Sequence, residues 1–312
     1  MTPSRPRAAV NVDIDGLYLY DRIHGHAGGS GNAAGFDPAA HDPTVWTRGI
    51  PRFLDAFAQA GIQATFFVVA QDLAQADVRA VLKDCVAAGH EIGSHSFTHP
   101  YNLSRLAPDA IGEELVRARH TLQDATGQAV LGFRAPGYVL SDALRTAIAD
   151  VGHTWDSSRF PCPPYQLAKA TFIQAYKLLG RPSGSLIEPV GVWVGPRKPY
   201  RDRLPDGRTL VELPVGVLPG MRVPFIGTSV LMWGEAGRRV LAPVVARSDW
   251  MNFECHAIDL TDHAGDGIPD RLKTQPDQRV PLAKKGPLFQ KVLSDLARTH
   301  DVRTLGAWAA TL

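Results

Sequence analysis

Short apolar runs alternate with amphipathic stretches along the first half of the chain. Residues 8–15 (AAVNVDID) have the composition of a strand, and residues 62–70 (IQATFFVVA) are continuously apolar, as in a strand buried on both faces. Between them, residues 48–61 repeat apolar side chains at helical spacing, and Gly61 follows the last repeat, as glycine often follows a helix. The pattern therefore predicts a strand, a helix and a second strand.

The same alternation continues along the chain. Further helices are predicted over residues 76–89, 108–127 and 141–152, and further strands over 90–95, 130–136, 153–158, 208–215, 250–258 and 301–306. Repeated strand–helix units indicate an α/β fold with a parallel sheet, either doubly wound or closed into a barrel. Because the chain offers seven or eight such strands, we expect the barrel.

Two segments interrupt this alternation. Residues 21–47 are rich in Gly, His and Asn, and residues 159–208 are rich in proline. We expect both to be long loop insertions within a single domain spanning residues 1–312. Such loops either wall a substrate cleft or are variable surface insertions. Residues 167–180 within the second are apolar, which fits either a core helix or a peripheral contact with a membrane or acyl chain.

Composition excludes several classes of protein. Hydrophobic residues make up 45% of the 312 residues and charged residues 21%, the balance of an ordinary globular protein. The formal net charge of +2 gives no reason to expect a nucleic-acid partner. Three widely spaced cysteines, Cys85, Cys162 and Cys255, fit reduced thiols better than a disulfide framework or a zinc ribbon. With no signal-peptide core before Asp13 and no membrane-spanning run, we expect a cytoplasmic protein.

Polar residues follow the predicted strands at the point where each strand ends. They are Asp13 and Asp15, His95 and His99, Arg134 and Tyr138, Asp156, and His256. The carboxyl ends of the strands of an α/β barrel share one rim, and active sites form there. The sequence therefore predicts that these side chains meet in one site.

The spacing of two pairs favours a catalytic metal ion. Asp13 and Asp15 are two apart, so a strand directs both carboxylates to one side, one as metal ligand and the other as base. His95 and His99 are four apart, so a helical turn would let both imidazoles bind one ion. Ser96 stands where the zinc metalloprotease motif has Glu, which excludes that class. Each pair alone also fits solvated aspartates or a structural histidine pair.

The five motifs taken together resemble the polysaccharide deacetylases with a NodB homology domain, carbohydrate esterase family 4. The motifs occur in the family's order from residue 8 to about residue 260. They are the aspartate pair, here in the spaced form with Ile14 between its members, HSFTH, FRAPGY, WDSS and FECHAID. The resemblance implies a distorted (β/α)7–8 barrel of the polysaccharide-deacetylase type.

The resemblance also implies a role for each residue. Asp15, His95 and His99 would hold one divalent metal ion, zinc first and cobalt, nickel, manganese or iron as alternatives. Asp13 would be the general base, although the spaced motif leaves the division of roles between the two aspartates open. Arg134 and Asp156 would orient Asp13. The backbone N–H of Tyr138 would stabilise the oxyanion, with Gly137 able to shift that donor by one residue, and His256 would protonate the leaving amine.

The reaction implied is hydrolysis of an N-acetyl or N-formyl group from an amino sugar, on a small-molecule, cytoplasmic or lipid-linked glycoside. The alternatives are a non-sugar amide, as in the allantoinase-like branch, and an inactive carbohydrate-binding protein. Basic residues within 197–208 suit either a phosphate or solvent. Candidate aromatic platforms for a sugar are Trp46, Tyr101, Tyr138, Trp155 and Trp233. Four further histidines, expected in loops, are His24, His26, His41 and His263, and of these His24 or His26 could enter the cleft.

Overall fold

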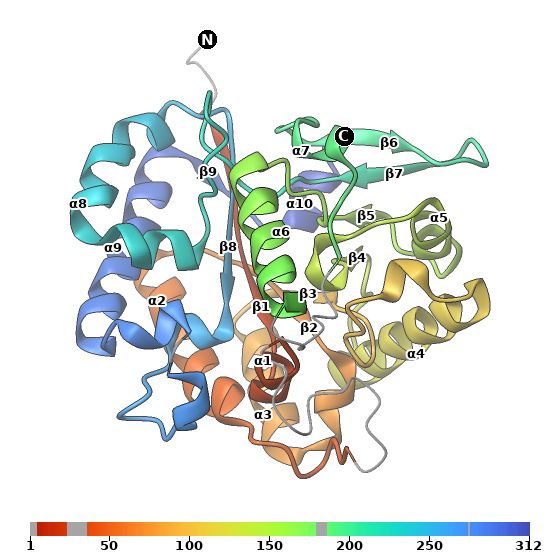
Figure 1. Cartoon of the computed structure of the whole chain (residues 1–312), viewed down its shortest axis with the longest axis horizontal. Helices are drawn as coiled ribbons and strands as arrows, with labels where there is room; N and C mark the ends of the chain where they lie inside the picture. The colour runs from red at the N-terminus through yellow and green to blue at the C-terminus, as the bar shows by residue number, and fades with distance from the viewer. Residues whose placement is uncertain (1–4, 24–35, 179–185, 274) are drawn as a thin grey trace.

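A computed structural model describes residues 5–23, 36–178, 186–273 and 275–312, and Figure 1 shows one curved sheet at its centre. The strands are β1 (Arg7–Ile14), β2 (Thr65–Val68), β3 (Glu91–Ser94), β4 (Gly132–Phe133), β5 (Trp155–Asp156), β6 (Tyr200–Arg203), β7 (Thr209–Glu212), β8 (Trp250–His256) and β9 (Asp301–Val302). Their order is β6-β7-β5-β4-β3-β2-β1-β8, and β9 also pairs with β1. Every pair is parallel except β6 with β7.

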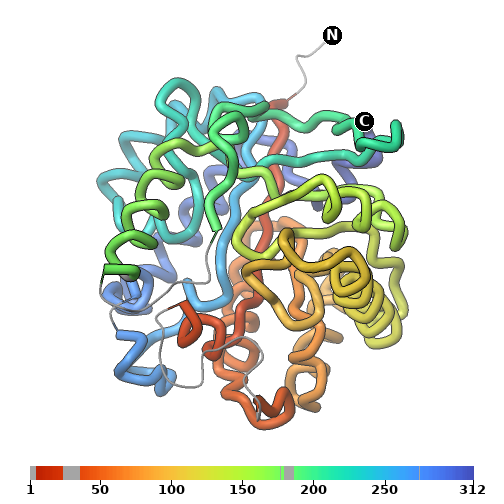
Figure 2. Tube along the Cα trace, turned by 45° about the vertical axis from the view of Figure 1, so that its right-hand side comes forward, coloured from red at the N-terminus to blue at the C-terminus, as the bar shows by residue number. Residues whose placement is uncertain are grey.

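Helices cover the outside of this sheet (Figure 1; Figure 2). They are α1 (Leu17–Ile23), α2 (Ile50–Ala60), α3 (Ala76–Ala87), α4 (Pro108–Thr126), α5 (Asp142–Asp150), α6 (Pro163–Leu178), α7 (Val190–Trp193), α8 (Gly227–Ala246), α9 (Leu282–Thr299) and α10 (Leu305–Ala309). The apolar side chains of β1, β2 and β8 pack against the helices in a continuous core that includes Val10, Phe66, Phe253 and Phe289. Burial of this apolar surface is the main driving force for the fold.

The sheet curls toward a barrel. The chain that follows β7 returns to β8, where the backbone N–H of Gly216 donates to Asn252 O at 2.8 Å. The side-chain amide of Asn252 donates to Leu213 O and to Pro214 O, both at 3.1 Å. The predicted α/β barrel-like fold is confirmed, and the curl brings the carboxyl ends of distant strands together.

Several elements differ from the sequence prediction. Helices α8 and α9 were not predicted, since Gly234 breaks the helical backbone of α8 and prolines lie inside both helices. The predicted insertion 159–208 contains α6, α7 and β6. Of the insertion 21–47, residues 24–35 lie outside the described residues, and His24 and His26 with them. No helix in the described ranges is long and apolar enough to span a membrane. The three cysteines are buried free thiols, as predicted.

Candidate active site

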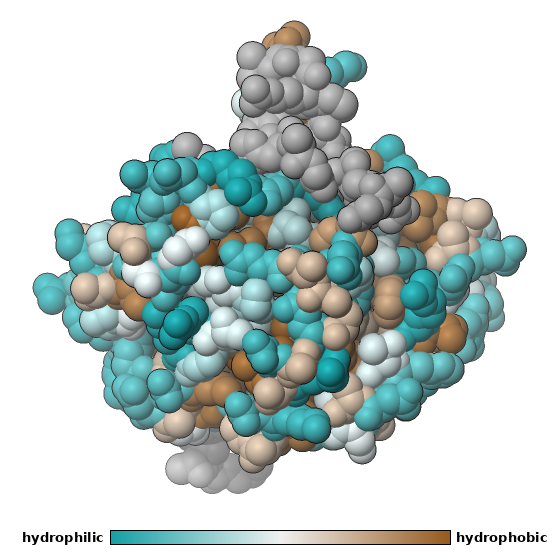
Figure 3. Space-filling model, turned by 90° about the horizontal axis from the view of Figure 1, so that it is seen from below, coloured by the Kyte–Doolittle hydropathy of each residue, from teal (hydrophilic) through white to brown (hydrophobic). Residues whose placement is uncertain are grey.

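The predicted polar residues gather where the parallel strands end. Strand register places Asp13 directly beside His256, because β1 and β8 are neighbours. The backbone N–H of Arg134, after β4, donates to Ser94 O at the end of β3. In Figure 1 β1 and β8 run downward and α1 lies below the end of β1, and Figure 3, seen from below, shows a surface of mixed hydrophilic and hydrophobic residues.

Asp15, His95 and His99 form a group that could hold a metal ion. All three are buried, and one ligand atom from each lies within 4.8 Å of the others. Oδ1 of Asp15 is 3.6 Å from Nε2 of His95 and 3.6 Å from Nε2 of His99. Among the described residues this buried oxygen has no hydrogen-bond donor. A buried carboxylate oxygen between two imidazole nitrogens fits a divalent cation, which would satisfy all three.

A second contact orients His95, and both histidines lie in one tight loop. Nδ1 of His95 is 2.8 Å from the carbonyl oxygen of Arg134, so a proton on Nδ1 leaves the Nε2 lone pair free for a metal. The histidines do not lie on a helical turn, as the spacing suggested. Ser96 and His99 have positive φ values of 65° and 57°, so this segment is a tight loop. Glu114 anchors it by accepting from the backbone N–H groups of Phe97 and Thr98.

Asp13 is held by a fully buried arginine. Nη1 of Arg134 donates to Oδ1 of Asp13 at 2.6 Å, and the other oxygen of Asp13 lies 3.9 Å from Nε2 of His95. Arg134 also donates to Ser157, through Nε to the backbone oxygen and through Nη2 to Oγ, each at 2.8 Å. Because the guanidinium is fixed by these contacts, the Asp13 carboxylate is held in one orientation. The structure thus brings together Asp13 and Arg134, as predicted from the motifs.

His256 is paired with Glu254, which the sequence reasoning missed. Nδ1 of His256 is 2.9 Å from Oε1 of Glu254, and Nε2 is 3.9 Å from Oδ2 of Asp15. Desolvation by burial lowers the pKa of His256, but the negative charges of Glu254, Asp15 and Asp13 together raise it more, and the net pKa is well above the usual value. The sequence could have indicated this pair, because Glu254 and His256 are two apart on one strand, and side chains at that spacing face the same side.

Asp156 lies apart from Asp13. Its Oδ1 accepts from Oγ of Ser158 at 2.7 Å, and it shares a hydrogen bond with the buried Glu212. Burial and the neighbouring Asp156 raise the pKa of Glu212 well above its usual value. Oγ of Ser158 accepts from the backbone N–H of Ala135, the residue after Arg134. Asp156 therefore supports the backbone beside Arg134 and makes no described contact with Asp13.

Tyr138 occupies a strained turn beside the site. Its φ is 65°, an uncommon value for a residue with a side chain, and Gly137 before it has the same value. The backbone N–H of Tyr138 donates to Ala135 O at 2.9 Å, so this predicted oxyanion donor is already engaged. The ring packs against Phe160 and Tyr165.

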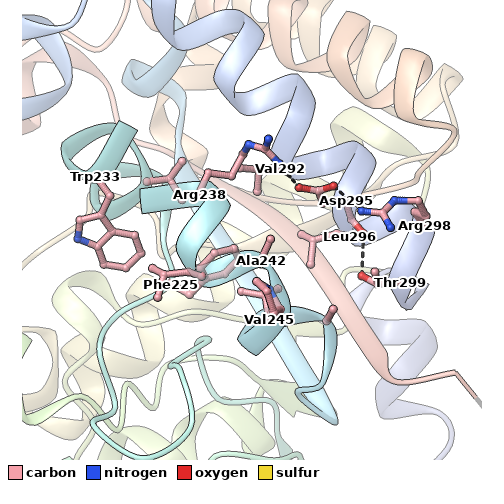
Figure 4. A pocket seen from close by; sticks show the side chains of 14 residues that line it. Phe225, Trp233, Arg238, Ala242, Val245, Val292, Asp295, Leu296, Arg298 and Thr299 are labelled. Carbon is pink, nitrogen blue, oxygen red and sulfur yellow. Dashed lines mark hydrogen bonds and ion pairs between the residues drawn. The ribbon is translucent and has the colours of Figure 1, made fainter. Parts of the chain in front are cut away.

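Only some of the proposed aromatic platforms are near these residues. Tyr101 packs edge-on against His99, with ring centroids 4.7 Å apart. Trp46 and Trp155 are almost fully buried, so neither can stack on a sugar. Trp233 lines an apolar pocket of about 250 Å³ between α8 and α9 (Figure 4). None of the eight predicted site residues lines that pocket.

Comparison with known proteins gives a family match over part of the chain. Residues 36–155 match the family model described as polysaccharide deacetylase. The matched range includes His95, His99, Arg134 and Tyr138. The other four predicted site residues, Asp13, Asp15, Asp156 and His256, lie outside it.

Curated relatives and solved structures extend this match. A chitooligosaccharide deacetylase of Bradyrhizobium sp. is 35% identical over 99 residues, which cover 31% of this chain and 44% of the relative. A peptidoglycan deacetylase of Helicobacter pylori is 27% identical over 150 residues, 48% of each chain. The chain thus matches slightly less than half the length of these relatives.

Two crystal structures share the fold over nearly the whole chain. A putative polysaccharide deacetylase from Mycobacterium smegmatis superposes with a TM-score of 0.60 at 17% identity, covering 100% of this chain and 91% of the other. Puue allantoinase has a TM-score of 0.59 at 16% identity, covering 98% and 90%. Residues 36–155 therefore match the polysaccharide deacetylase family, and the chain as a whole shares the fold of these two structures.

Proposed function

We propose that this protein is a metal-dependent hydrolase that removes an N-acyl group, acetyl or formyl, from an amino sugar. The observation that carries the proposal is the convergence of three groups at one strand edge: the buried Asp15–His95–His99 triad, Asp13 with Arg134, and His256 with Glu254. The deacetylase relatives act on chitooligosaccharide and peptidoglycan, and their names support an amino-sugar substrate for this chain too.

The triad suits a catalytic rather than a structural ion. Three protein ligands leave coordination positions open, and two imidazoles with one carboxylate favour zinc, with cobalt, nickel, manganese or iron as alternatives. When bound there, a divalent ion would polarise the amide carbonyl and make a nearby water more acidic.

The chain's own residues supply the proton transfers. Asp13 is the proposed general base, because Arg134 holds Oδ1 while Oδ2 faces the triad. His256 is the proposed general acid. Glu254 holds its Nδ1, which leaves Nε2, 3.9 Å from Asp15, as the nitrogen that can give a proton to the leaving amine. An amide requires such an acid, since an unprotonated amine anion leaves very poorly.

A substrate panel tests the reaction and the substrate class together. The panel contains N-acetyl and N-formyl amino sugars, simple N-acyl amides and allantoin, assayed with added zinc. Free amine is measured for the sugars and the amides. Allantoate is measured for allantoin, because its ring opens without releasing an amine. We expect hydrolysis of the amino sugars that stops when a chelator is present. Hydrolysis confined to allantoin or the simple amides would assign the non-sugar alternative, and no hydrolysis by protein that contains one metal ion per chain would favour a binding protein.

A further inference from the structure

Two cationic side chains lie beside the triad without a described acidic partner. Arg22, near the end of α1, donates from Nη1 to Thr98 O at 3.2 Å. Lys169, on α6, donates from Nζ to Gly137 O at 2.9 Å. Across the part of the chain that the structure describes, neither side chain forms an ion pair with a carboxylate. Each contact uses one donor, whereas a guanidinium offers five and an ammonium three.

Both cations lie near Tyr101. Thr98, which Arg22 contacts, directly precedes the proposed ligand His99, and the His99 ring lies 4.7 Å from the Tyr101 ring. The charge of Arg22 acts on the Tyr101 hydroxyl. A Cβ atom placed on Gly137 would lie 3.4 Å from Tyr101 Cδ1 and 3.7 Å from Lys169 Nζ. Two positive charges therefore lie near the aromatic ring that contacts His99.

Other arginines and lysines of the neighbourhood are already paired. Arg134 binds Asp13, and Arg159 lies 3.2 Å from Glu188. In the basic segment 197–208, the phosphate-binding candidate from the sequence, two side chains are paired: Lys198 with Asp249, and Arg208 with Asp206 and Asp150. Arg22 and Lys169 differ from these cations because they have no described carboxylate partner and lie near Tyr101.

Burial makes an anionic partner favourable at this position. Loss of solvent lowers the pKa of Lys169 to about 8, although Glu188 partly offsets the effect, and burial also lowers the pKa of Arg22. A partly dehydrated cation gains more from an anion than a solvated cation does, and both side chains are common phosphate ligands.

We propose that Arg22 and Lys169 bind a phosphate group on the substrate, so that the enzyme acts on an amino sugar that carries phosphate. The inference rests on the proposed function and adds a substrate class to it. The phosphate belongs either to a soluble sugar phosphate or to a lipid carrier.

The test compares two substrates that differ in one phosphate group. N-acetylglucosamine 1-phosphate and methyl N-acetylglucosaminide are assayed for amine release, and the ratio of their kcat/KM values is the readout. We expect the wild type to favour the phosphate. Arg22→Gln and Lys169→Gln should each lower the ratio roughly tenfold or more, mainly through KM, as loss of a charged hydrogen bond predicts. Lys177→Gln, an exposed lysine on the same helix, should leave the ratio unchanged.

A binding measurement separates this inference from the proposed reaction. Calorimetric titration with N-acetylglucosamine 1-phosphate needs no turnover, and the same loss of affinity is expected in both variants. Binding that depends on Arg22 and Lys169, without amine release from any sugar, would retain the phosphate site and reject the reaction. Equal preference or equal affinity in wild type and variants would overturn the phosphate site.

The source of the phosphate is tested with the same sugar phosphate attached to a polyprenyl chain in detergent micelles. A higher kcat/KM for the lipid-linked form assigns the lipid carrier, and a higher value for the soluble form assigns the sugar phosphate. In either case the preference should depend on Arg22 and Lys169.

Discussion

Oε1 of Glu254 lies 2.9 Å from Nδ1 of His256 on the same strand, at the strand edge where Asp13 and Asp15 also lie. Glu254 is 1% exposed, so its charge acts on the imidazole with little screening by solvent. The pair explains how the partly buried His256 can remain protonated, which the proposed general acid requires.

Glu254→Gln tests this pairing. The amide can still contact the ring but removes the negative charge, so the pKa of His256 should fall. A general acid works only below its pKa, so the alkaline limb of the kcat profile should move to lower pH, and kcat near neutrality should drop about 10- to 100-fold. Glu254→Asp should recover part of the loss. An unchanged alkaline limb in Glu254→Gln would contradict the assignment of His256 as the acid.

Asp13→Asn tests the proposed base. The side-chain oxygen of asparagine can still accept from Arg134, so the fold and the triad should persist. The amide cannot accept a proton from water, and kcat should fall by about 10²- to 10⁴-fold. Metal content and melting temperature serve as controls and should remain near the wild-type values. Full turnover by this variant would mean that another group is the base.

His99→Ala tests the metal site. Loss of one of three ligands should lower metal content after dialysis against a mild chelator, measured by inductively coupled plasma mass spectrometry. His120→Ala is the matched control, because His120 is exposed on α4, and it should retain the ion. Equal metal content in both variants would exclude His99 as a ligand.

Asp259 should make the free energy of unfolding depend on pH, independently of catalysis. Burial, followed by the charge of Asp277, raises the pKa of Asp259 to about 7. The folded protein therefore holds a proton that the unfolded chain releases near pH 4, and this contribution to stability is lost as pH rises toward 7. Asp259→Asn stays neutral, and its oxygen can still accept from the backbone N–H of His256.

The free energies of unfolding of Asp259→Asn and wild type should therefore be similar near pH 4. Above pH 7 the variant should be more stable, by an amount on the order of a few kcal/mol. Urea unfolding of both proteins at several pH values, in chelator, measures the difference. A constant difference from pH 4 to 8 would contradict a raised pKa for Asp259.

The sequence predicted the parts of the site that depend on local spacing. The alternation of strands and helices was enough to predict that two pairs meet at the strand ends. These pairs are Asp13 and Asp15 on a strand, and His95 and His99 in a short segment. The loop conformation of the histidine segment was not predicted, because it depends on Glu114 from α4.

Contacts between distant segments could not be predicted from one sequence. Asp156 was expected beside Asp13, but Glu212 and Ser158 bind it instead, and Glu212 reaches it only because β7 pairs with β5. Similarly, Arg22 and Lys169 come near Tyr101 only once α1 and α6 have packed at the strand ends. Residue type suggested that each could be functional, but the fold decides which residues are neighbours.

Titration of zinc into metal-free protein tests the central claim most directly. Amine release from the best substrate of the panel is measured after each addition, for wild type and for His99→Ala. The account predicts that activity rises in proportion to zinc and levels off at one ion per chain, with no comparable rise in the variant. Full activity of the metal-free wild type, or an equal rise in both proteins, would contradict catalysis at the Asp15–His95–His99 site.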